Sequence, residues 1–383
     1  NKREQNQTCL DSAEREGLRP KGNVPNLRFP EFQGEWEKCI LGDITENFNL
    51  RNKDKIQYPM FSVTNDRGFV PQSEQFEGRE MVGEDIKAYK IIHTNDFAYN
   101  PARINVGSIA MYTGEKPCMI SSLYVCFKTT KEVNNEWLMQ LLKTPKMNYY
   151  YNVNGEGGVR VYLFYPNFAR IRMSIPKIEE QKKIAKLLNL IDERIATQNK
   201  IIDKLQSLIK GISSRIFASI QGIEYRMGDI VTITNGNSNV QDAVTQSKDG
   251  LYPFFDRSED IKYLPTFLFD KEAIIYPGEG TEFMPRYFKG KFALHQRCYA
   301  IFDFNEIINA RFLYFYLKTR NSYFVKNAVG STVPSLRLDT FQKLKVIIPP
   351  TKTQHSVSSC LSSMEQKCNV EKKILHKLLK QKQ

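Results

Sequence analysis

The residues best suited to contact another molecule lie in the segment 284–297, which reads MPRYFKGKFALHQR. Cationic and amide side chains alternate there with aromatic ones, over a stretch with the pattern of a β-hairpin. In the major groove of DNA, arginine reads guanine, asparagine or glutamine reads adenine, and lysine neutralises phosphates. This chemistry makes six residues candidates for DNA contact: Arg286, Lys289, Lys291, His295, Gln296 and Arg297.

Loops elsewhere in the chain carry residues of the same types. The stretches NPARINVGS, KPCMISS and GGVRVY in the first half, together with an arginine and a serine–threonine step in the second half, supply further candidates. They are Arg103, Asn105, Lys116, Ser121, Ser122, Arg160, Arg257, Ser331 and Thr332. Each residue taken alone also fits an ordinary solvated surface, but clusters on loops at matching places in the two halves favour DNA contact.

The motifs that catalysis would require are incomplete. A DNA amino-methyltransferase needs a polar residue, two prolines and an aromatic residue in a row, and the Pro349-Pro350 step lacks both flanking members. The glycine-rich stretch YPGEGTEF has no helix pattern behind it, and the triplet 260–262 (Asp-Ile-Lys) has no Pro-Asp partner upstream. Four dispersed histidines offer no catalytic or zinc-binding arrangement. The sequence therefore predicts a chain with no catalysis, cofactor or metal of its own.

The composition favours a basic, globular protein of two domains. With 383 residues, 41% hydrophobic residues and a mean hydropathy of −0.46, the chain is long enough for two cores and has no run resembling a membrane span. The net charge of +13 indicates a polyanionic partner, nucleic acid first, although an inert basic surface would carry the same charge. Seven cysteines without a CxxC pair favour free thiols and the cytoplasm. We expect residues 1–22 to be a disordered leader or a cloning remnant.

The second half of the chain repeats the first. Gln181 and Gln354 are one of several identical pairs whose members lie 173 positions apart. Short runs rich in Tyr, Phe, Ile and Val follow in the same order in both halves, as expected of strands. Each copy then continues with a short helix, at 136–142 and 310–319, a glycine-bearing loop, a last strand and a proline. The repeat predicts two equivalent α+β modules with mostly-β cores.

A long helix pattern closes each half. Apolar residues recur at three- and four-residue spacing, which defines a heptad seam, and one polar residue interrupts it at the matching place in each helix. The seam comprises Leu188, Ile191, Ile195, Gln198, Ile202, Leu205 and Ile209 in the first helix, and Leu361, Met364, Cys368, Glu371, Leu375 and Leu378 in the second. About 40 residues at 1.5 Å each make the first helix roughly 60 Å long, more than one module can cover.

These lengths predict that the two helices pack on each other as an antiparallel coiled coil separating the modules, rather than each on its own module. The first helix begins with two glutamates, which suit the positive end of a helix dipole. At the start of the second helix, the spacing of Thr351 and Gln354 predicts a capping box.

In this arrangement the chain resembles the specificity subunit of Type I restriction-modification systems, HsdS. The resemblance covers nearly the whole chain from Asn23 onward and rests on the opening NVPNLRFPEFQGEWEKCILGDI and the phrase IPKIEEQKKIAKLLNLIDERI. The stretch VGSTVPSLRLDTFQKLKVIIPP is similar to the family's Gly-Gly-Thr-Gln-Pro-Asn loop with the Ile-Pro-Leu-Pro that follows. The first copy of this loop, GEGGVRVYLFYPNFARIRMSIP, departs from the pattern because it lacks the Thr-x-Pro step.

The resemblance implies two target-recognition domains, each reading one half of a split double-stranded DNA site, and paired helices that space the halves and dock two methyltransferase (HsdM) subunits. It also implies restriction and translocation (HsdR) subunits, with S-adenosylmethionine, ATP and Mg held by these partners, in a bacterial cytoplasm without membrane attachment. The expected parts are a leader and N-terminal segment (1–34), a first recognition domain (35–177), a central spacer helix (178–222), a second recognition domain (223–349) and a C-terminal spacer helix (350–383).

Two other functions stay open on the sequence alone. A non-catalytic scaffold would use its repeat modules to bind proteins, with an incidental basic charge. A fused restriction-methylation enzyme would need a catalytic motif that the chain lacks. Salt separates the DNA reader from the scaffold, because DNA binding that releases counterions weakens steeply as salt rises.

Overall fold

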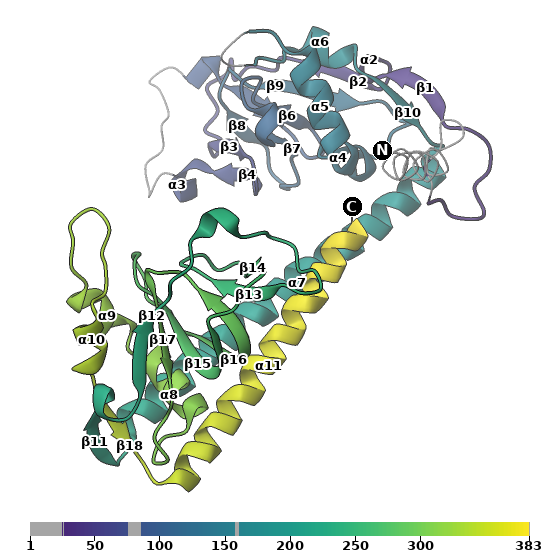
Figure 1. Cartoon of the computed structure of the whole chain (residues 1–383). Helices are drawn as coiled ribbons and strands as arrows, with labels where there is room; N and C mark the ends of the chain where they lie inside the picture. The colour runs from purple at the N-terminus through teal and green to yellow at the C-terminus, as the bar shows by residue number, and fades with distance from the viewer. Residues whose placement is uncertain (1–24, 26, 76–85, 158–160, 383) are drawn as a thin grey trace, which may run out of the picture. The chain divides into compact units, whose positions relative to one another are not determined.

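The chain forms two compact units, Asn1–Glu193 and Arg194–Gln383, drawn as a ribbon in Figure 1. The computed structural model describes residues 25, 27–75, 86–157 and 161–382. Each unit holds one module, and the long helix α7 (Ile178–Ser219) begins in the first unit and continues into the second. The predicted α+β class with two repeated modules is confirmed. The expected leader at 1–22 lies outside the described residues.

The first module is built from short strands, because its β-forming residues come in runs of three to five. Its largest sheet has four antiparallel strands in the order β2-β9-β6-β7, and β1-β10, β3-β4 and β5-β8 form separate pairs. The strands are β1 (Glu37–Ile40), β2 (Thr45–Phe48), β3 (Phe61–Thr64), β4 (Gly68–Pro71), β5 (Lys90–Ile92), β6 (Phe97–Tyr99), β7 (Ile109–Met111), β8 (Cys118–Ile120), β9 (Val125–Thr129) and β10 (Arg172–Ile175). The helices are α2 (Leu41–Ile44), α3 (Gln72–Gln75), α4 (Asn135–Leu142), α5 (Pro145–Asn154) and α6 (Tyr165–Ala169), with 3-10 turns η1 (Ile86–Ala88) and η2 (Ile104–Val106).

Aromatic side chains fill the core of the first module. Phe97 and Phe127 stack with 4.9 Å between ring centroids, and Phe168 lies 5.2 Å from both Phe127 and Tyr99. Trp137 from α4 packs into the same core and is 3% exposed. Aromatic pairs of this kind contribute about 0.5–1.5 kcal/mol each beyond the burial of their area. The core therefore fixes β6, β9, α4 and α6 against one another.

The second module has one larger sheet of six strands, in the order β12-β17-β15-β16-β13-β14, and a separate pair, β11-β18. Its strand pairs are antiparallel except β13 with β16, which run in parallel. The strands are β11 (Ile223–Arg226), β12 (Thr232–Asn235), β13 (Tyr252–Phe255), β14 (Lys262–Leu264), β15 (Phe269–Pro277), β16 (Arg286–Leu294), β17 (Cys298–Phe302) and β18 (Lys345–Ile348). The helices are α8 (Ala310–Lys318), α9 (Asn321–Asn327), α10 (Leu338–Gln342) and α11 (Thr351–Lys382), with 3-10 turns η3 (Met227–Asp229) and η4 (Val240–Asp242).

The two modules repeat one pairing scheme. β1 pairs antiparallel with β10 as β11 does with β18, and β9 lies between β2 and β6 as β17 lies between β12 and β15. Helices α4 and α8 both start at an asparagine cap. Asn134 Oδ1 accepts from Trp137 N at 2.8 Å, and Asn309 Oδ1 accepts from Phe312 N at 2.9 Å. The sequence repeat is therefore a repeat of structure down to individual hydrogen bonds.

A buried glutamine joins each module to its closing helix. In the first unit, Gln181 Oε1 accepts from Asn134 N at 2.8 Å, while Nε2 donates to Glu132 O at 3.0 Å and to Pro176 O at 2.8 Å. In the second unit, Gln354 has the matching partners Asn309 N at 2.7 Å, Ile307 O at 2.8 Å and Pro349 O at 2.9 Å. Both glutamines are 1% exposed, so these bonds satisfy the polar groups of two buried side chains.

The structure corrects the role expected for Gln354. A capping box with Thr351 would turn its side chain back to the start of its own helix. Its amide oxygen instead accepts from Asn309 N, ahead of α8. The spacing that predicted a local cap therefore marks a contact between distant segments.

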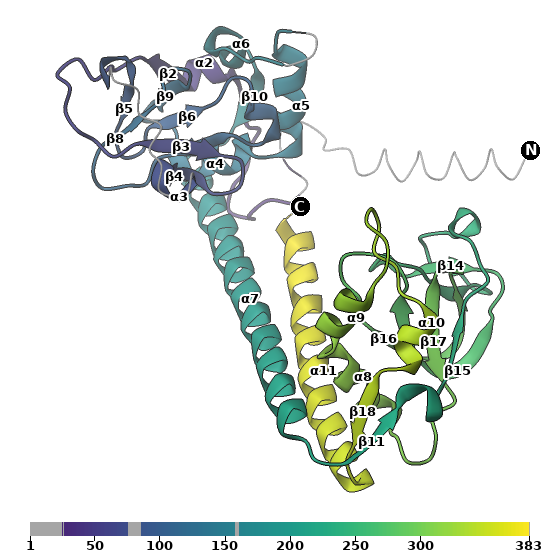
Figure 2. The ribbon, with the colours of Figure 1, turned by 90° about the vertical axis from the view of Figure 1, so that its left-hand side faces the viewer.

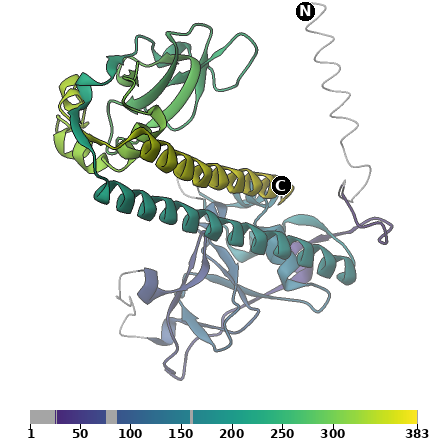
Figure 3. The ribbon, with the colours of Figure 1, turned by 90° about the horizontal axis from the view of Figure 1, so that it is seen from below.

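Within the second unit, α7 and α11 lie side by side (Figures 2 and 3). Gln198 Nε2 donates to Glu371 Oε2 at 2.6 Å and to Glu371 O at 3.2 Å. Ile216, late in α7, and Leu361, early in α11, join the same core. The helices therefore run in opposite directions in this unit, with a polar pair at the place predicted from the heptad pattern.

The predicted seam positions differ in burial. The buried ones are Gln198, Ile202, Leu361, Cys368 and Leu378. The half-buried ones are Leu188, Ile191, Ile195, Leu205, Ile209, Met364, Glu371 and Leu375. Leu188 and Ile191 belong to the part of α7 in the first unit.

Along the described ranges, no helix combines the length and apolar character needed to cross a bilayer. The six cysteines in those ranges have free thiols. The same residues include no group of three or more His, Cys, Asp and Glu placed to hold a metal ion.

Candidate nucleic-acid interface

Two parallel strands bring candidate residues of the second module to one edge of its sheet. β13 and β16 pair with Phe255 opposite Leu294, and His295 N donates to Phe255 O at 2.9 Å. Because the two strands run in the same direction, the segments that follow them leave the sheet next to each other. Arg257 and Gln296, both exposed, belong to these two segments.

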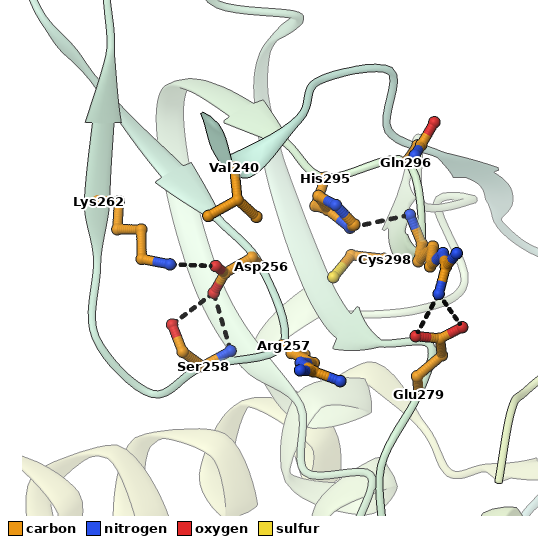
Figure 4. Close-up of a pocket in the computed structure, with 10 residues that line it drawn as sticks. Val240, Asp256, Arg257, Ser258, Lys262, Glu279, His295, Gln296 and Cys298 are labelled. Carbon is orange, nitrogen blue, oxygen red and sulfur yellow. Dashed lines mark hydrogen bonds and ion pairs between the residues drawn. The ribbon is translucent and has the colours of Figure 1, made fainter. Parts of the chain in front are cut away.

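A cavity of about 500 Å³ lies between these segments (Figure 4). Its lining includes four residues predicted from the sequence: Arg257, His295, Gln296 and Arg297. The strand β15 reaches the same place, because Pro277 pairs with Cys298. Position 278, directly after β15, requires glycine, because a Cβ there would lie 2.1 Å from Arg297 O. This close approach places Glu279 beside Arg297.

One wall of the cavity is held by a buried carboxylate. Asp256, 3% exposed, accepts from Lys262 Nζ at 2.6 Å and from Ser258 N at 2.8 Å. Burial opposes its ionisation, but the hydrogen bonds from Lys262 and Ser258 hold the pKa of Asp256 below its ordinary value. The charged pair therefore fixes the turn from which Arg257 projects. Asp256 and Lys262 bind each other, so this pair supports the wall of the cavity.

The opposite wall carries an arginine–glutamate pair. Arg297 Nη1 donates to Glu279 Oε1 at 2.9 Å and to Oε2 at 3.0 Å. Arg297 N donates to His295 Nδ1 at 3.2 Å, which leaves the proton of the neutral ring on Nε2. Burial lowers the pKa of His295, which favours that neutral form at neutral pH. The turn 295–297 therefore presents a supported arginine, an imidazole N–H and the exposed amide of Gln296.

Arg286 supports one wall of the cavity. Its Nη1 donates to Ser258 O at 2.9 Å, its Nη2 donates to Asp256 O, and its guanidinium lies 5.1 Å from the centroid of the Phe255 ring. Two of its donors therefore support the 256–258 turn, through partners from another strand that the sequence did not reveal. The DNA contact predicted for Arg286 stays a prediction.

Lys289 and Lys291 are exposed on β16 but do not line the cavity, and Lys291 Nζ lies 4.8 Å from the centroid of the Phe267 ring. Ser331 and Thr332 are exposed in the loop between α9 and α10. That loop is bound to the cavity wall, because residue 335 bridges Glu279 and Leu336 N donates to Gly278 O at 2.8 Å. The end of this loop therefore contacts the cavity wall, whereas Ser331 and Thr332 do not line the cavity.

The first module docks its corresponding loop in the same way. Leu163 N donates to Pro101 O at 3.0 Å, which matches the bond from Leu336 to Gly278 in the second module. Arg103, exposed, follows directly after Pro101 and Ala102. Asn105 Nδ2 donates to Asn152 Oδ1 at 3.0 Å, so its amide is held against α5. Arg103 and Asn105 therefore lie on the turn where the loop is docked.

Three more candidates of the first module flank β8. Lys116, exposed, precedes β8, which pairs with β5, and Ser121 and Ser122 follow it in the connection to β9. β9 pairs with β6 as β17 pairs with β15, so this connection matches the 295–297 turn of the second module. Arg160 lies outside the described residues. The DNA contacts predicted for these four residues stay predictions.

Two features of the site were missed from the sequence. Glu279 lies in the glycine-rich stretch YPGEGTEF, outside the basic segment 284–297, and the pairing of β15 with β17 places it beside Arg297. Tyr162 and Phe164, 37% and 48% exposed, stack with 6.2 Å between ring centroids next to the docked loop of the first module. The alternation of aromatic residues in the stretch VYLFY could have indicated the stacked pair of Tyr162 and Phe164.

Known proteins share the sequence pattern of both modules. The family model for the Type I restriction modification DNA specificity domain matches residues 33–207 and 223–380. The chain is 28% identical to the EcoDI specificity subunit of Escherichia coli over 138 residues, which cover 36% of this chain and 30% of that protein. It is 25% identical to the putative MjaX specificity subunit of Methanocaldococcus jannaschii over 205 residues, 51% of this chain and 48% of that protein. The chain thus spans about a third to a half of the length of these relatives.

Solved structures share the fold. The S subunit of a Type I restriction-modification system from M. genitalium superposes with a TM-score of 0.63 at 15% identity, over 94% of this chain and 96% of that one. A chain from a study of complex assembly and conformational transition in the type I R-M system superposes with a TM-score of 0.54 at 12% identity, over 94% and 97%. At these identities the likeness establishes the fold.

Proposed function

This chain belongs to the Type I restriction modification DNA specificity family, and we propose that it is the DNA-reading, non-catalytic subunit of a Type I restriction-modification complex. Each module reads one half of a bipartite double-stranded DNA site. The net charge of +13 supplies the attraction to phosphates on which such binding depends.

The observation that carries the proposal is the equivalent site in the two modules. Each module docks a loop onto the end of a core strand by one backbone bond, from Leu163 to Pro101 in the first and from Leu336 to Gly278 in the second. Exposed polar or basic residues surround both places, Arg103 in the first and Gln296 in the second. Two equivalent reading surfaces on one chain suit a DNA site of two parts.

The partners follow from the same proposal. The helices α7 and α11 space the two half-sites and dock two methyltransferase (HsdM) subunits, and HsdR subunits add ATP-driven restriction. S-adenosylmethionine, ATP and Mg are held by those partners, with none in this chain. The complex works in the cytoplasm, where its DNA substrate is found, and the expected product is adenine methylated on its exocyclic amine in both half-sites.

Methyl transfer to DNA tests the proposal. The chain alone, the methyltransferase partners alone and the two together are incubated with labelled S-adenosylmethionine and DNA from a host that lacks the system. We expect label in the DNA only when the chain and its partners are combined. Transfer by the chain alone, or unchanged transfer by the partners without it, would overturn the proposal.

Salt dependence separates this function from a protein scaffold. Binding of the assembled complex to duplex DNA should fall by about 10³–10⁵ between 50 and 200 mM salt if 6–10 phosphates are contacted. DNA binding that stays the same as salt rises would favour the alternative function, a protein-binding scaffold whose basic charge is incidental.

A further inference from the structure

The arginine–glutamate pair on the cavity wall is arranged to read one base. We propose that Arg297, positioned by Glu279, recognises a guanine in the half-site of the second module. This inference rests on the proposed function and goes beyond it, because it names one residue, its positioning partner and the base they select.

The geometry leaves one edge of the guanidinium available. Both bonds from Arg297 to Glu279 use Nη1, at 2.9 and 3.0 Å from the two carboxylate oxygens. The Nε and Nη2 donors therefore remain for another molecule. Guanine offers two acceptors, O6 and N7, in the major groove, and arginine binds them through two donors at once. The side chain of Arg297 is 63% exposed, so its free edge is accessible.

Glu279 is held more firmly than an ordinary surface partner. Its side chain is 18% exposed, and its backbone follows the close approach at Gly278. Gly280 N donates to Pro334 O at 3.0 Å, and residue 335 bridges Glu279 itself. These bonds fix the backbone from which the Glu279 carboxylate extends. A fixed carboxylate lowers the entropy that Arg297 loses when it binds a base, which favours recognition.

Another ion pair in the same unit shows the contrast. Lys271 and Asp303 lie 2.6 Å apart with side chains 40% and 52% exposed, so both partners face solvent. Exposed pairs of that kind contribute little and guide no ligand. A half-buried carboxylate paired with an exposed arginine suits a binding surface, because the carboxylate holds the arginine while the guanidinium still faces solvent.

The first module lacks an arginine–glutamate pair at the corresponding place. Its docking bond to Pro101 matches the bond to Gly278, which places Ala102 where the second module has Glu279. Leu123 stands where the second module has Arg297, because Tyr99 pairs with Val125 as Tyr276 pairs with Tyr299. The inference applies to one half-site, and the other half-site supplies an internal reference.

The test uses the assembled complex in a host, with the methylated motif read by methylome sequencing. The variants are Arg297→Lys and Glu279→Gln, with Asp303→Asn as the matched control for loss of a paired carboxylate. We expect one G·C position in one half-site of the unmodified protein. Both Arg297→Lys and Glu279→Gln should relax that single position by about 5- to 150-fold, while Asp303→Asn leaves the motif unchanged.

A modified base gives the direct readout. Replacing the guanine at that position by 7-deazaguanine removes N7 and keeps O6, so the unmodified complex should lose about tenfold or more in binding. The same replacement should have little further effect on the Arg297→Lys complex, because the paired contact is already absent. Equal losses in both complexes would overturn the inference.

The outcomes also distinguish the inference from the function beneath it. Relaxation at an A·T position would overturn the inference. Weakening of both half-sites together with a lower melting temperature would also overturn it, because the pair would then be structural. In either case a bipartite motif would still support the function. An unchanged motif in Glu279→Gln would overturn the positioning role. No sequence-specific methylation by the unmodified complex would overturn both.

Discussion

The two modules share the bonds that join them to the long helices and differ in the sheets that carry the candidate residues. Gln181 and Gln354 make the same three hydrogen bonds in their own units. The hairpin strands differ, because β6 and β7 have three residues each and β15 and β16 have nine. The comparison teaches that one module can change its reading surface without changing its attachment to the spacer.

The chemistry of the two surfaces differs as well. The second module presents the Arg297–Glu279 pair, and the first presents Arg103 near the stacked rings of Tyr162 and Phe164. Charge-supported hydrogen bonding suits base edges, and exposed rings suit stacking and shape readout. We therefore expect the two half-sites to have different sequences.

The largest expected effect comes from lengthening the helix that connects the modules. Inserting four helix-forming residues after Thr197 adds about 6 Å and about 40° of net rotation, at 1.5 Å and 3.6 residues per turn. DNA advances 3.4 Å and turns about 35° per base pair, so the gap between half-sites should grow by about one base pair. Methylome sequencing measures the gap, and both half-site sequences should stay as they were.

Thr197→Ala is the matched control, because it alters the same exposed turn without changing the length. Insertion before Gln198 keeps the Gln198–Glu371 bond in place within the second unit. An active, folded insertion variant with the old gap would show that the helix does not set the spacing.

The next largest effect is expected from the two glutamines that join each module to its closing helix. Gln354→Ala leaves the partly buried groups Asn309 N and Ile307 O and the buried Pro349 O without their partner, which should lower the free energy of unfolding by about 2–4 kcal/mol. Gln181→Ala should cost a similar amount in the first unit. Denaturant titration measures both, with Gln366→Ala, exposed on α11, as the control.

Equal losses from the two variants sharpen the comparison. If only one of the two variants lost free energy of unfolding, the two glutamines would differ in their contribution although they make the same bonds.

The smallest effect is a pH dependence confined to the second unit. Burial lowers the pKa of His295 from its ordinary 6.5, so the unfolded chain binds a proton more readily than the folded one. The stability that neutral His295 contributes is present above pH 6.5 and is lost as the pH falls toward the folded pKa. Denaturant titrations from about pH 8 to about pH 5 should therefore show a steeper loss for the unmodified protein than for His295→Gln. Parallel curves would contradict the prediction.

Much of the fold followed from the sequence, because repeated patterns report on repeated structure. The period of 173 residues predicted two equivalent modules, and the heptad pattern placed Gln198 opposite Glu371, where the structure has a hydrogen bond. Gln354 was placed in a local cap, because spacing within one helix does not reveal a partner such as Asn309, which is distant in sequence.

The site followed only in part. Four predicted residues line one cavity, because short turns after paired strands hold neighbouring residues together. The contact of Arg286 with Phe255 was not predicted, because it depends on the pairing of β13 with β16. Glu279 was missed for the same reason, since its distance from Arg297 depends on the pairing of β15 with β17.

The central claim is that each module reads its own half of the DNA site. The most direct measurement is methylome sequencing of a host that carries the assembled complex with Arg103→Ala in the first module or Gln296→Ala in the second. We predict a bipartite motif in which each substitution relaxes a different half, by about 1–3 kcal/mol of discrimination per lost base contact. A motif whose two halves change together under either substitution would contradict the claim.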